Sequence, residues 1–395
     1  MSIEKRLIAI VGGTGAQGIP IVRELARSGS YTLRILTRDA TSRRFQELRS
    51  CDPDIEAVEG TFASEADLRA LFRGAWGAFV NIDGFNSGEM AEMFWTARAY
   101  ELATEARVQM FVYGGLDYYL KKGGYDSAFR VGHGDAKGRM ADWILAQTTG
   151  DNGNRDSDSD SNGMKAAVFT TGPYIDMAIS AATIMAPRVE EDEAGGGSIL
   201  TWRMPLGPDG AVAHVALGDC GYYVKWLFEH PDRAHGLNLE VAIDHITYDE
   251  MARAFTSVTG RPARFIDVGF DEYFTDTARF FGDGKNGNHR GVDGPAGYNA
   301  NAESPATLSF RQNFTGFWNV WRHSQRSNTR DSVVRRDYAL LDEIHPRRIR
   351  SAEEWFRMEE QRGLELGLGS LWERVQPDRL MPVLKVTEEG GVRSL

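Results

Sequence analysis

A short apolar run followed by three regularly spaced glycines constrains the fold of this chain more than any other feature. The stretch "IAIVGGTGAQGIPIV" places Gly12, Gly15 and Gly18 between a buried-strand pattern and residues with helical spacing. This order is typical of a dinucleotide-binding βαβ unit. Gly12 permits the tight turn, Gly15 lets the backbone approach a pyrophosphate, and Gly18 lets the helix pack closely against the sheet. A purely structural turn is the less favoured alternative.

The next 160 residues alternate between short apolar runs and helical patterns. Strands are predicted at Leu7–Val11, Thr32–Thr37, Ile55–Val58, Ala75–Ile82, Gln109–Tyr113 and "KAAVFTT". One helix follows Ser64, which is placed to cap it, and a long one starts at about Ser87. Such alternation predicts an α/β fold, a Rossmann-type doubly wound parallel sheet with its ligand at the carboxyl ends of the strands.

Beyond residue 180 the alternation fades, and a smaller, mixed second lobe is predicted. We expect residues 1–180 to bind the cofactor and residues 181–395 to form a substrate or partner lobe, with some segments returning to the sheet. Two polar stretches, 150–163 and 282–305, are predicted to be flexible insertions. Each could carry a modification or partner site, but their composition favours surface loops without a specific function.

Composition excludes several classes of function. The 395 residues carry a formal charge of −11, which argues against direct nucleic-acid binding. Two cysteines are too few for a disulfide framework, and no run of apolar residues is long enough to cross a membrane. The N-terminus lacks the pattern of a signal peptide, so we expect a cytoplasmic protein. The eight histidines show no metal-ligand spacing, and no metal is expected.

The end of the second strand predicts which dinucleotide binds. Thr37 and Arg38 stand where an NAD site usually has an acid, and Arg43 and Arg44 follow. Guanidinium groups suit a 2′-phosphate, so NADP(H) is predicted, although the acidic residue Asp39 would favour NAD(H). The predicted cofactor contacts are Gly12, Thr14, Gly15, Gln17, Gly18, Arg38, Arg43, Asn81 and Lys137.

Several motifs, taken in chain order, resemble the NmrA-like family, a branch of the atypical short-chain dehydrogenase/reductases. They include "GGTGAQG", "TRDATSRR", "MFVYGGLDYY", "HGDAKGRMADWI", "TTGPYIDM", "HVALGDCGYYV", "YDEMARAFTSVTGRP", "NFTGFWNVW" and "RRDYALLDEIHPRRIRSAEEW". The resemblance implies a Rossmann domain, a smaller lobe and NADP(H). Members of this family include reductases related to isoflavone reductases, fungal reductases of secondary metabolism, and catalytically silent NADP sensors that regulate other proteins.

The sequence departs from this family at the expected catalytic positions. Short-chain reductases need a Ser, and a Tyr and Lys spaced as Tyr-x-x-x-Lys. Lys137 matches the lysine, but His133 stands at the tyrosine position and Gly114 at that of the serine. Gly60-Thr61 replaces the common Gly-Asp near the adenine.

His133 and Lys137 are therefore the candidate catalytic pair. Four residues apart, they share a helix face, and Lys137 near the nicotinamide ribose would lower the pKa of a neighbouring proton donor. His133 could then protonate the reduced atom. A surface pair without function is the structural alternative. Tyr118 is a third catalytic candidate, and the other tyrosines that could reach a substrate are Tyr113, Tyr119 and Tyr174.

The sequence predicts an NADP(H)-dependent oxidoreductase acting on a carbonyl, C=C or C=N bond of a small organic molecule, as in secondary metabolism. The alternative is a non-enzymatic NADP(H) sensor that binds a protein partner. The missing Ser and Tyr favour the sensor. The tyrosine-rich loops and the aromatic second lobe favour the enzyme.

Overall fold

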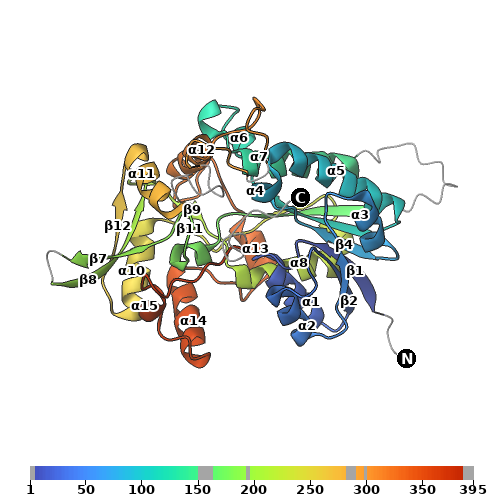
Figure 1. The fold of residues 1–395 in the computed structure, drawn as a ribbon, viewed down its shortest axis with the longest axis horizontal. Helices are drawn as coiled ribbons and strands as arrows, with labels where there is room; N and C mark the ends of the chain where they lie inside the picture. Colours follow the sequence, from blue (N-terminus) through green and yellow to red (C-terminus); the bar gives the residue numbers. More distant parts are fainter. Residues whose placement is uncertain (1–4, 150–162, 193–195, 282–290, 298–299, 386–395) are drawn as a thin grey trace.

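The computed structural model of the chain describes residues 5–149, 163–192, 196–281, 291–297 and 300–385 (Figure 1). The polar insertion predicted at 150–163 lies outside the described residues except for Gly163, and so do parts of the segment 282–305.

The central element is a seven-stranded parallel sheet in the order β10-β6-β5-β4-β1-β2-β3. Its strands are β1 (Arg6–Val11), β2 (Tyr31–Thr37), β3 (Glu56–Glu59), β4 (Gly77–Val80), β5 (Met110–Leu116), β6 (Lys165–Thr171) and β10 (Asn238–Glu240). The predicted Rossmann-type sheet is therefore confirmed.

Helices cover both faces of this sheet, and alternate side chains of β1 show why. Ile8 and Ile10 point into one apolar layer, whereas Ala9 and Val11 point into the other. The first layer is covered by α1 (Gly18–Arg27), α2 (Arg43–Cys51), α8 (Leu217–Glu229) and α13 (Tyr338–Ile344). The second is covered by α3 (Glu65–Phe72), α5 (Glu89–Glu105) and α7 (Gly132–Thr149).

The strand order reverses between β1 and β4, and this reversal positions the site. The chain runs outward from β1 to β3 and then returns to place β4 on the other side of β1. Ligands bind at such switch points, outside the carboxyl ends of the strands. Here the glycine turn follows β1, and Asn81 follows β4 directly, donating its backbone N–H to Val11 O at 3.2 Å.

Local sequence signals explain several element boundaries. Ser64 accepts a hydrogen bond from Asp67 N and caps α3 as predicted. The long helix predicted from about Ser87 is α5, which begins at Glu89. Gly88, with a φ of +78°, separates it from the short helix α4 (Gly84–Ser87).

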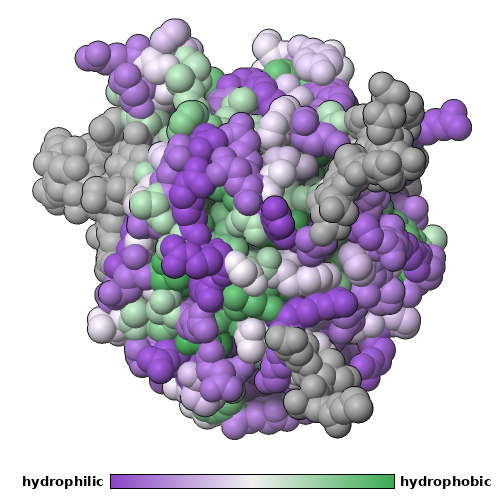
Figure 2. Space-filling model, turned by 90° about the vertical axis from the view of Figure 1, so that its right-hand side faces the viewer, coloured by the Kyte–Doolittle hydropathy of each residue, from purple (hydrophilic) through white to green (hydrophobic). Residues whose placement is uncertain are grey.

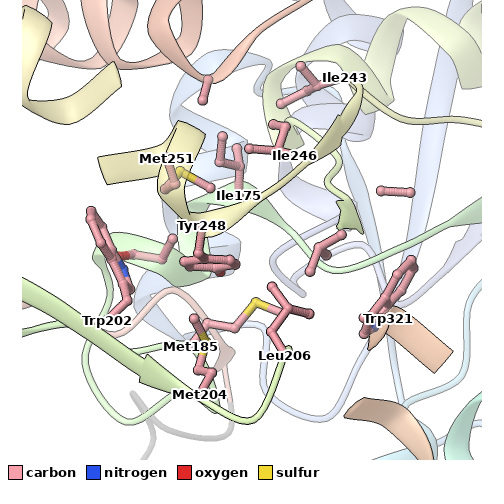
Figure 3. Close-up of a cluster of buried hydrophobic side chains, with 14 of the residues drawn as sticks. Ile175, Met185, Trp202, Met204, Leu206, Ile243, Ile246, Tyr248, Met251 and Trp321 are labelled. Atoms are coloured by element: carbon pink, nitrogen blue, oxygen red, sulfur yellow. The ribbon is translucent and has the colours of Figure 1, made fainter. Parts of the chain in front are cut away.

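The smaller lobe lies at the left of Figure 1 and is built on a second, mixed sheet. It contains β7 (Arg188–Asp192), β8 (Gly197–Met204), β12 (Ala263–Asp267), the short pair β9 (Val212–Ala213) and β11 (His245–Ile246), and the helices α10 (Tyr248–Thr259), α11 (Phe270–Phe281), α12 (Phe310–Arg322), α14 (Ala352–Glu365) and α15 (Leu371–Arg374). Trp202, Tyr248 and Met185 pack together in its core (Figure 3). The remaining elements are α6 (Tyr119–Lys122), α9 (Pro231–Ala234) and two short 3-10 helices at Ser127–Phe129 and Ile175–Ile179.

A buried ion pair ties a late segment of the chain to the sheet. The guanidinium of Arg336 contacts both carboxylate oxygens of Asp117, at 3.0 and 2.7 Å, and both side chains are fully buried. Burial alone would raise the pKa of Asp117, but Arg336 and Lys122 together hold it well below its usual range. This pair fixes residue 336 against the loop that follows β5.

The end of the molecule formed by the large sheet presents a mainly hydrophilic face with scattered hydrophobic patches (Figure 2). Among the helices that the structure describes, none combines the length and the apolar character needed to cross a membrane.

Candidate functional site

A cavity of about 670 Å³ opens at the switch point between β1 and β4. Its volume lies within the range of about 300–1,000 Å³ that is usual for small-molecule and cofactor sites. Most of the residues predicted from the sequence to form the site line it, namely Gly12, Thr14, Gly15, Gln17, Gly18, Arg38, Asn81, His133 and Lys137. Arg43 and Tyr118 do not.

The glycine turn has the close backbone packing that a pyrophosphate cradle needs. A Cβ on Gly12 would lie 2.4 Å from Asn81 O, and one on Gly18 would lie 2.1 Å from Gly12 O. Gly12 also has a φ of +84°, which favours glycine. No side chain caps the start of α1 at Gln17, although Ile19 N already donates to Gly15 O at 3.1 Å and Pro20 has no N–H. The positive end of the helix dipole lies beside the cavity, where it favours an anion. The turn therefore fits a dinucleotide.

A directed chain of hydrogen bonds forms the floor of the cavity. Lys137 Nζ donates to Asn81 Oδ1 at 3.0 Å, and Asn81 Nδ2 donates to Gln17 Oε1. Gln17 Nε2 in turn donates to Thr171 Oγ1 at 3.2 Å. These hydrogen bonds join α7, the residue after β4, the residue before α1, and β6, so three of the predicted cofactor residues are held in one network. A network whose members are all paired gives a rigid polar surface.

The ammonium of Lys137 is engaged by the protein itself. Besides Asn81, it donates to Ile82 O at 2.8 Å and Gly114 O at 3.2 Å, so three acceptors use its three protons. Glu92 Oε1 lies 2.8 Å from the ammonium and is its charge partner. Lys137 thus orders the floor, and in this arrangement no proton is left for a ribose hydroxyl.

Glu92, which sequence reasoning did not identify, is fully buried under the site. Burial raises the pKa of its carboxyl group to about 7, and the charge of Lys137 opposes this shift. Its only sequence signal is an acid in the first turn of a helix. Acids are common there for reasons unrelated to a site.

Asn81 explains why a glycine stands at the family's serine position. A Cβ on Gly114 would lie 2.8 Å from Asn81 Cβ and 2.9 Å from Asn81 Cγ. The Asn81 side chain therefore fills the space into which a serine at 114 would point. The departure at 114 is coupled to the residue that ends β4.

His133 faces an aromatic wall. Its ring lies 4.5 Å from the ring of Phe85, 5.7 Å from Phe314 and 6.1 Å from Phe317, measured between centroids. The Asn313 amide meets Nδ1, with Nδ2 at 2.9 Å and Oδ1 at 3.1 Å. Burial, and to a smaller extent the charge of Lys137, lower the pKa of His133 to about 4. His133 is therefore neutral at pH 7, so it is not an imidazolium acid that could protonate the reduced atom, the role expected from the sequence.

The arginines after β2 have different surroundings from one another. Arg38 is exposed and lines the cavity, and its pairing with a 2′-phosphate stays a prediction. Asp39 turns away, because its Oδ1 accepts from Thr41 N and Oγ1 at 2.7 and 2.6 Å. Arg43 pairs with Glu47 on the exposed face of α2, outside the cavity. Arg44 is buried and donates to Thr14 O, in the glycine turn, at 3.3 Å.

The tyrosines also separate into two groups. Tyr119 and Tyr174 line the cavity. The Tyr118 hydroxyl instead accepts a hydrogen bond from Arg139 Nε at 3.0 Å, and Tyr113 is fully buried in the apolar layer under α5 and α7. The structure therefore does not bring Tyr118 to the cavity, because the loop after β5 turns its ring outward onto Arg139.

Two further parts of the lining were not predicted. Val292, Pro295 and Ala296 belong to the segment expected to be an idle insertion, yet they line the cavity. Backbone hydrogen bonds to the start of α12 and to the residues before it hold them, such as Arg311 N to Val292 O at 2.7 Å and Ala296 N to Leu308 O at 2.9 Å. Lys385 reaches the glycine turn from the far end of the described chain. Among the described residues, no group of three or more His, Cys, Asp or Glu side chains is placed to hold a metal ion.

Comparisons with solved structures identify the same fold. The negative transcriptional regulator NmrA superposes with a TM-score of 0.65 at 14% identity, over 93% of this chain and all of that one. The triphenylmethane reductase of Citrobacter, complexed with NADP(H), superposes with a TM-score of 0.57 at 14% identity, over 88% and 98% of the two chains. At such low identities these likenesses show a shared fold.

Sequence comparisons identify the family. The NmrA-like family oxidoreductase hkm9 of Aspergillus hancockii is 30% identical over 267 residues, 67% of this chain and 76% of that protein. The oxidoreductase himF of Aspergillus japonicus is 29% identical over 270 residues, 66% and 75% of the two chains. A model of the NmrA-like family matches residues 4–129 and 162–282. The chain therefore belongs to the NmrA-like family.

Proposed function

We propose that this protein is an NADP(H)-dependent oxidoreductase that reduces a carbonyl, C=C or C=N bond of a small organic molecule. One observation carries the proposal: the glycine turn and His133, with its aromatic wall, open into the same cavity. Two further findings support it. The relatives hkm9 and himF are named oxidoreductases, and NmrA was solved in complex with NAD and with NADP.

The residues of the first half would hold the dinucleotide. The glycine turn would bind the pyrophosphate, and Arg38 would pair with a 2′-phosphate through its guanidinium. The floor formed by Gln17, Asn81 and Lys137 would present fixed polar atoms to the remainder. A bound nicotinamide dinucleotide supplies the hydride.

His133 would act on the substrate in its neutral form. When Asn313 Nδ2 donates to Nδ1, the single ring proton is on Nε2. From there it can donate a hydrogen bond to a substrate oxygen or nitrogen and polarise the bond to be reduced. A neutral imidazole held in this way acts as an electrophile, and the proton that completes the reduction then comes from solvent.

The apolar wall would select the substrate. Phe85, Phe314 and Phe317 offer ring faces, and Phe314 and Phe317 are almost fully buried. Such a surface binds uncharged, apolar molecules and excludes water from the reacting bond. Within the proposed division, residues 1–180 bind the cofactor and the later residues add most of this wall.

A direct experiment tests the proposal. The protein is incubated with NADPH and a metabolite extract of the source organism, and cofactor oxidation and product masses are followed together. We expect a product two hydrogens heavier than its precursor, formed at the rate of NADPH loss. The His133→Phe variant keeps the ring packing and removes the hydrogen-bond donor, so it serves as the matched control. If no compound in the extract accelerates NADPH oxidation, the enzyme proposal fails.

The second candidate is a cofactor-sensing regulator, and the state of Lys137 favours it. An ammonium that is saturated by protein acceptors is a structural element, and no Tyr stands at position 133. A sensor predicts a protein partner captured in only one of the NADP⁺-loaded and NADPH-loaded states. An oxidoreductase predicts turnover without such a partner.

A further inference from the structure

Residues 381–385 lie against the glycine turn, and we call this segment the C-terminal strap. Its backbone is fixed by Ser180, whose hydroxyl donates to Met381 O at 2.7 Å and accepts from Val383 N at 2.8 Å. Ala181 N adds a third hydrogen bond, to Met381 O at 3.1 Å. Ser180 is almost fully buried, so these bonds form in a place shielded from water.

Two cations join the strap to the turn. The buried guanidinium of Arg44 donates to Val383 O in the strap and to Thr14 O in the turn, at 3.3 Å each. Lys385 Nζ donates to Thr14 Oγ1 at 2.8 Å. Leu384 and Lys385 both line the cavity. The strap therefore contributes a wall of the cavity and brings a positive charge to its glycine end.

We propose that the C-terminal strap closes over the bound dinucleotide and that Lys385 is a ligand of its pyrophosphate. This inference rests on the proposed function, because it concerns the same cavity. Arg38 lines the same cavity. Opposite ends of the chain would therefore each supply a cation to one dinucleotide, Lys385 at the pyrophosphate and Arg38 at the 2′-phosphate. A lysine ammonium is a compact charge with three rotatable donors, which suits phosphate oxygens approached from one side.

The strap is a feature of this chain beyond the matched family region. The family model ends at residue 282, and the strap begins about a hundred residues later.

Loss of a pyrophosphate ligand should affect cofactor binding differently from loss of Arg38. The pyrophosphate is common to NADPH and NADH, so loss of Lys385 weakens the binding of both cofactors. The 2′-phosphate is present only in NADPH, so loss of Arg38 weakens NADPH alone.

The experiment measures Kd for NADPH and NADH by fluorescence titration, and the dissociation rates by stopped flow. For Lys385→Ala we expect both Kd values to rise about tenfold or more, the effect of losing one charge-assisted hydrogen bond, while Lys385→Arg retains most of the affinity. A chain that stops after Leu380 should show the same rise and faster release. A chain that stops after Lys385 is the matched control and should behave as the full chain does. Thermal unfolding of each variant without cofactor shows whether the fold is kept.

The outcomes separate the two proposals. If the full chain binds neither dinucleotide, the proposed function fails and the strap inference fails with it. If the full chain binds, but Lys385→Ala and the chain ending at Leu380 bind equally well and release no faster, the strap inference alone is overturned. Tighter binding by the chain ending at Leu380 would show that the strap blocks the site, and this too would overturn the inference.

Discussion

The carboxylate of Glu92 and the ammonium of Lys137 lie 2.8 Å apart directly beneath the cavity floor, with Glu92 fully buried. Because the pKa of Glu92 is about 7, its carboxyl group is partly ionised at neutral pH and offsets part of the charge of Lys137 inside the protein. The two side chains should consequently depend on each other for stability.

A double-mutant cycle tests this dependence. Lys137→Met leaves Glu92 buried without its charge partner, so it should destabilise the protein by several kcal/mol, about 3–5 for a broken buried pair. Adding Glu92→Gln should recover about 1–3 kcal/mol, measured as the coupling free energy in urea unfolding. The exposed pair Arg98–Glu101 is the control, and Glu101→Gln should change stability by less than about 1 kcal/mol. A coupling near zero would show that the buried charges are independent.

Arg38 should set the cofactor preference. Arg38→Ala removes the guanidinium that lines the cavity after β2. It should therefore reduce the difference between the binding free energies of NADPH and NADH by about 1–3 kcal/mol. Titration calorimetry with both cofactors measures this gap. Arg43→Ala is the matched control, because Arg43 pairs with Glu47 outside the cavity and its loss should leave the gap unchanged. Equal affinities of the unaltered protein for the two cofactors would refute the prediction at once.

His133 and Tyr118 should differ sharply in their effect on turnover. His133→Phe removes the donor that faces the cavity and should lower kcat about 10²–10³-fold, the scale of one lost polarising hydrogen bond. Tyr118→Phe should leave kcat unchanged, because its hydroxyl lies on Arg139 outside the cavity. Since the pKa of His133 is lowered to about 4, the pH profile should show no ionisation of this residue near 6.5. A reversed ranking of the two variants would assign proton delivery to the tyrosine.

The pair of Asp117 and Arg336 should make stability depend on pH in one direction. The folded-state pKa of Asp117 lies below its unfolded value of about 3.9, so its contribution is present above that pH and is lost as pH falls further. Asp117→Asn should cost about 3–5 kcal/mol at pH 7, and the difference from the unaltered protein should shrink below about pH 4. Urea unfolding at both pH values measures this. Asp142→Asn, which breaks an exposed pair with Lys121, is the control and should lower the free energy of unfolding by less than about 1 kcal/mol. A similar loss of stability in the Asp117 and Asp142 variants would contradict the prediction.

Replacing Gly114 by the serine that the family has at this position should destabilise the protein. Gly114→Ser places a Cβ 2.8 Å from Asn81 Cβ, so we expect destabilisation of about 1–3 kcal/mol from overpacking. The double variant Gly114→Ser/Asn81→Ala makes room for the new side chain and should be more stable than the single one. Thermal unfolding compares them, and a single variant as stable as the unaltered protein would show that Asn81 can move aside.

The sheet was predictable because its signals are local. The run before Gly12 and the helical spacing after Gly18 are recognised within about twenty residues, and short apolar runs indicated the remaining strands. Gln17 was predicted as a cofactor contact from its place in the glycine turn, Asn81 from its place at the end of the fourth strand, and Lys137 from its position in the family's motif. Their roles at the site remain predictions.

The features that escaped prediction depend on contacts across the chain. Nothing near Glu92 in the sequence reveals that Lys137, 45 positions later, needs a counter-charge. Residues 291–297 looked unstructured because they have few apolar side chains. Backbone hydrogen bonds to the residues around the start of α12 hold them in place, and amino-acid composition does not predict such bonds. The exclusion of a serine at 114 likewise depends on which residue ends a neighbouring strand.

The contact between Thr14 and Lys385 joins positions 371 residues apart. A ribosome releases the glycine turn among the first segments of the chain and the strap only after all the other described residues. During synthesis, β1 to β6 can therefore assemble into a sheet whose dinucleotide edge is still uncovered. If the strap closes over the dinucleotide as proposed, a nascent chain would take up its cofactor through an open entrance, whereas the finished protein would have to move the strap for each exchange. The order of synthesis would then influence how much of the newly made protein is loaded.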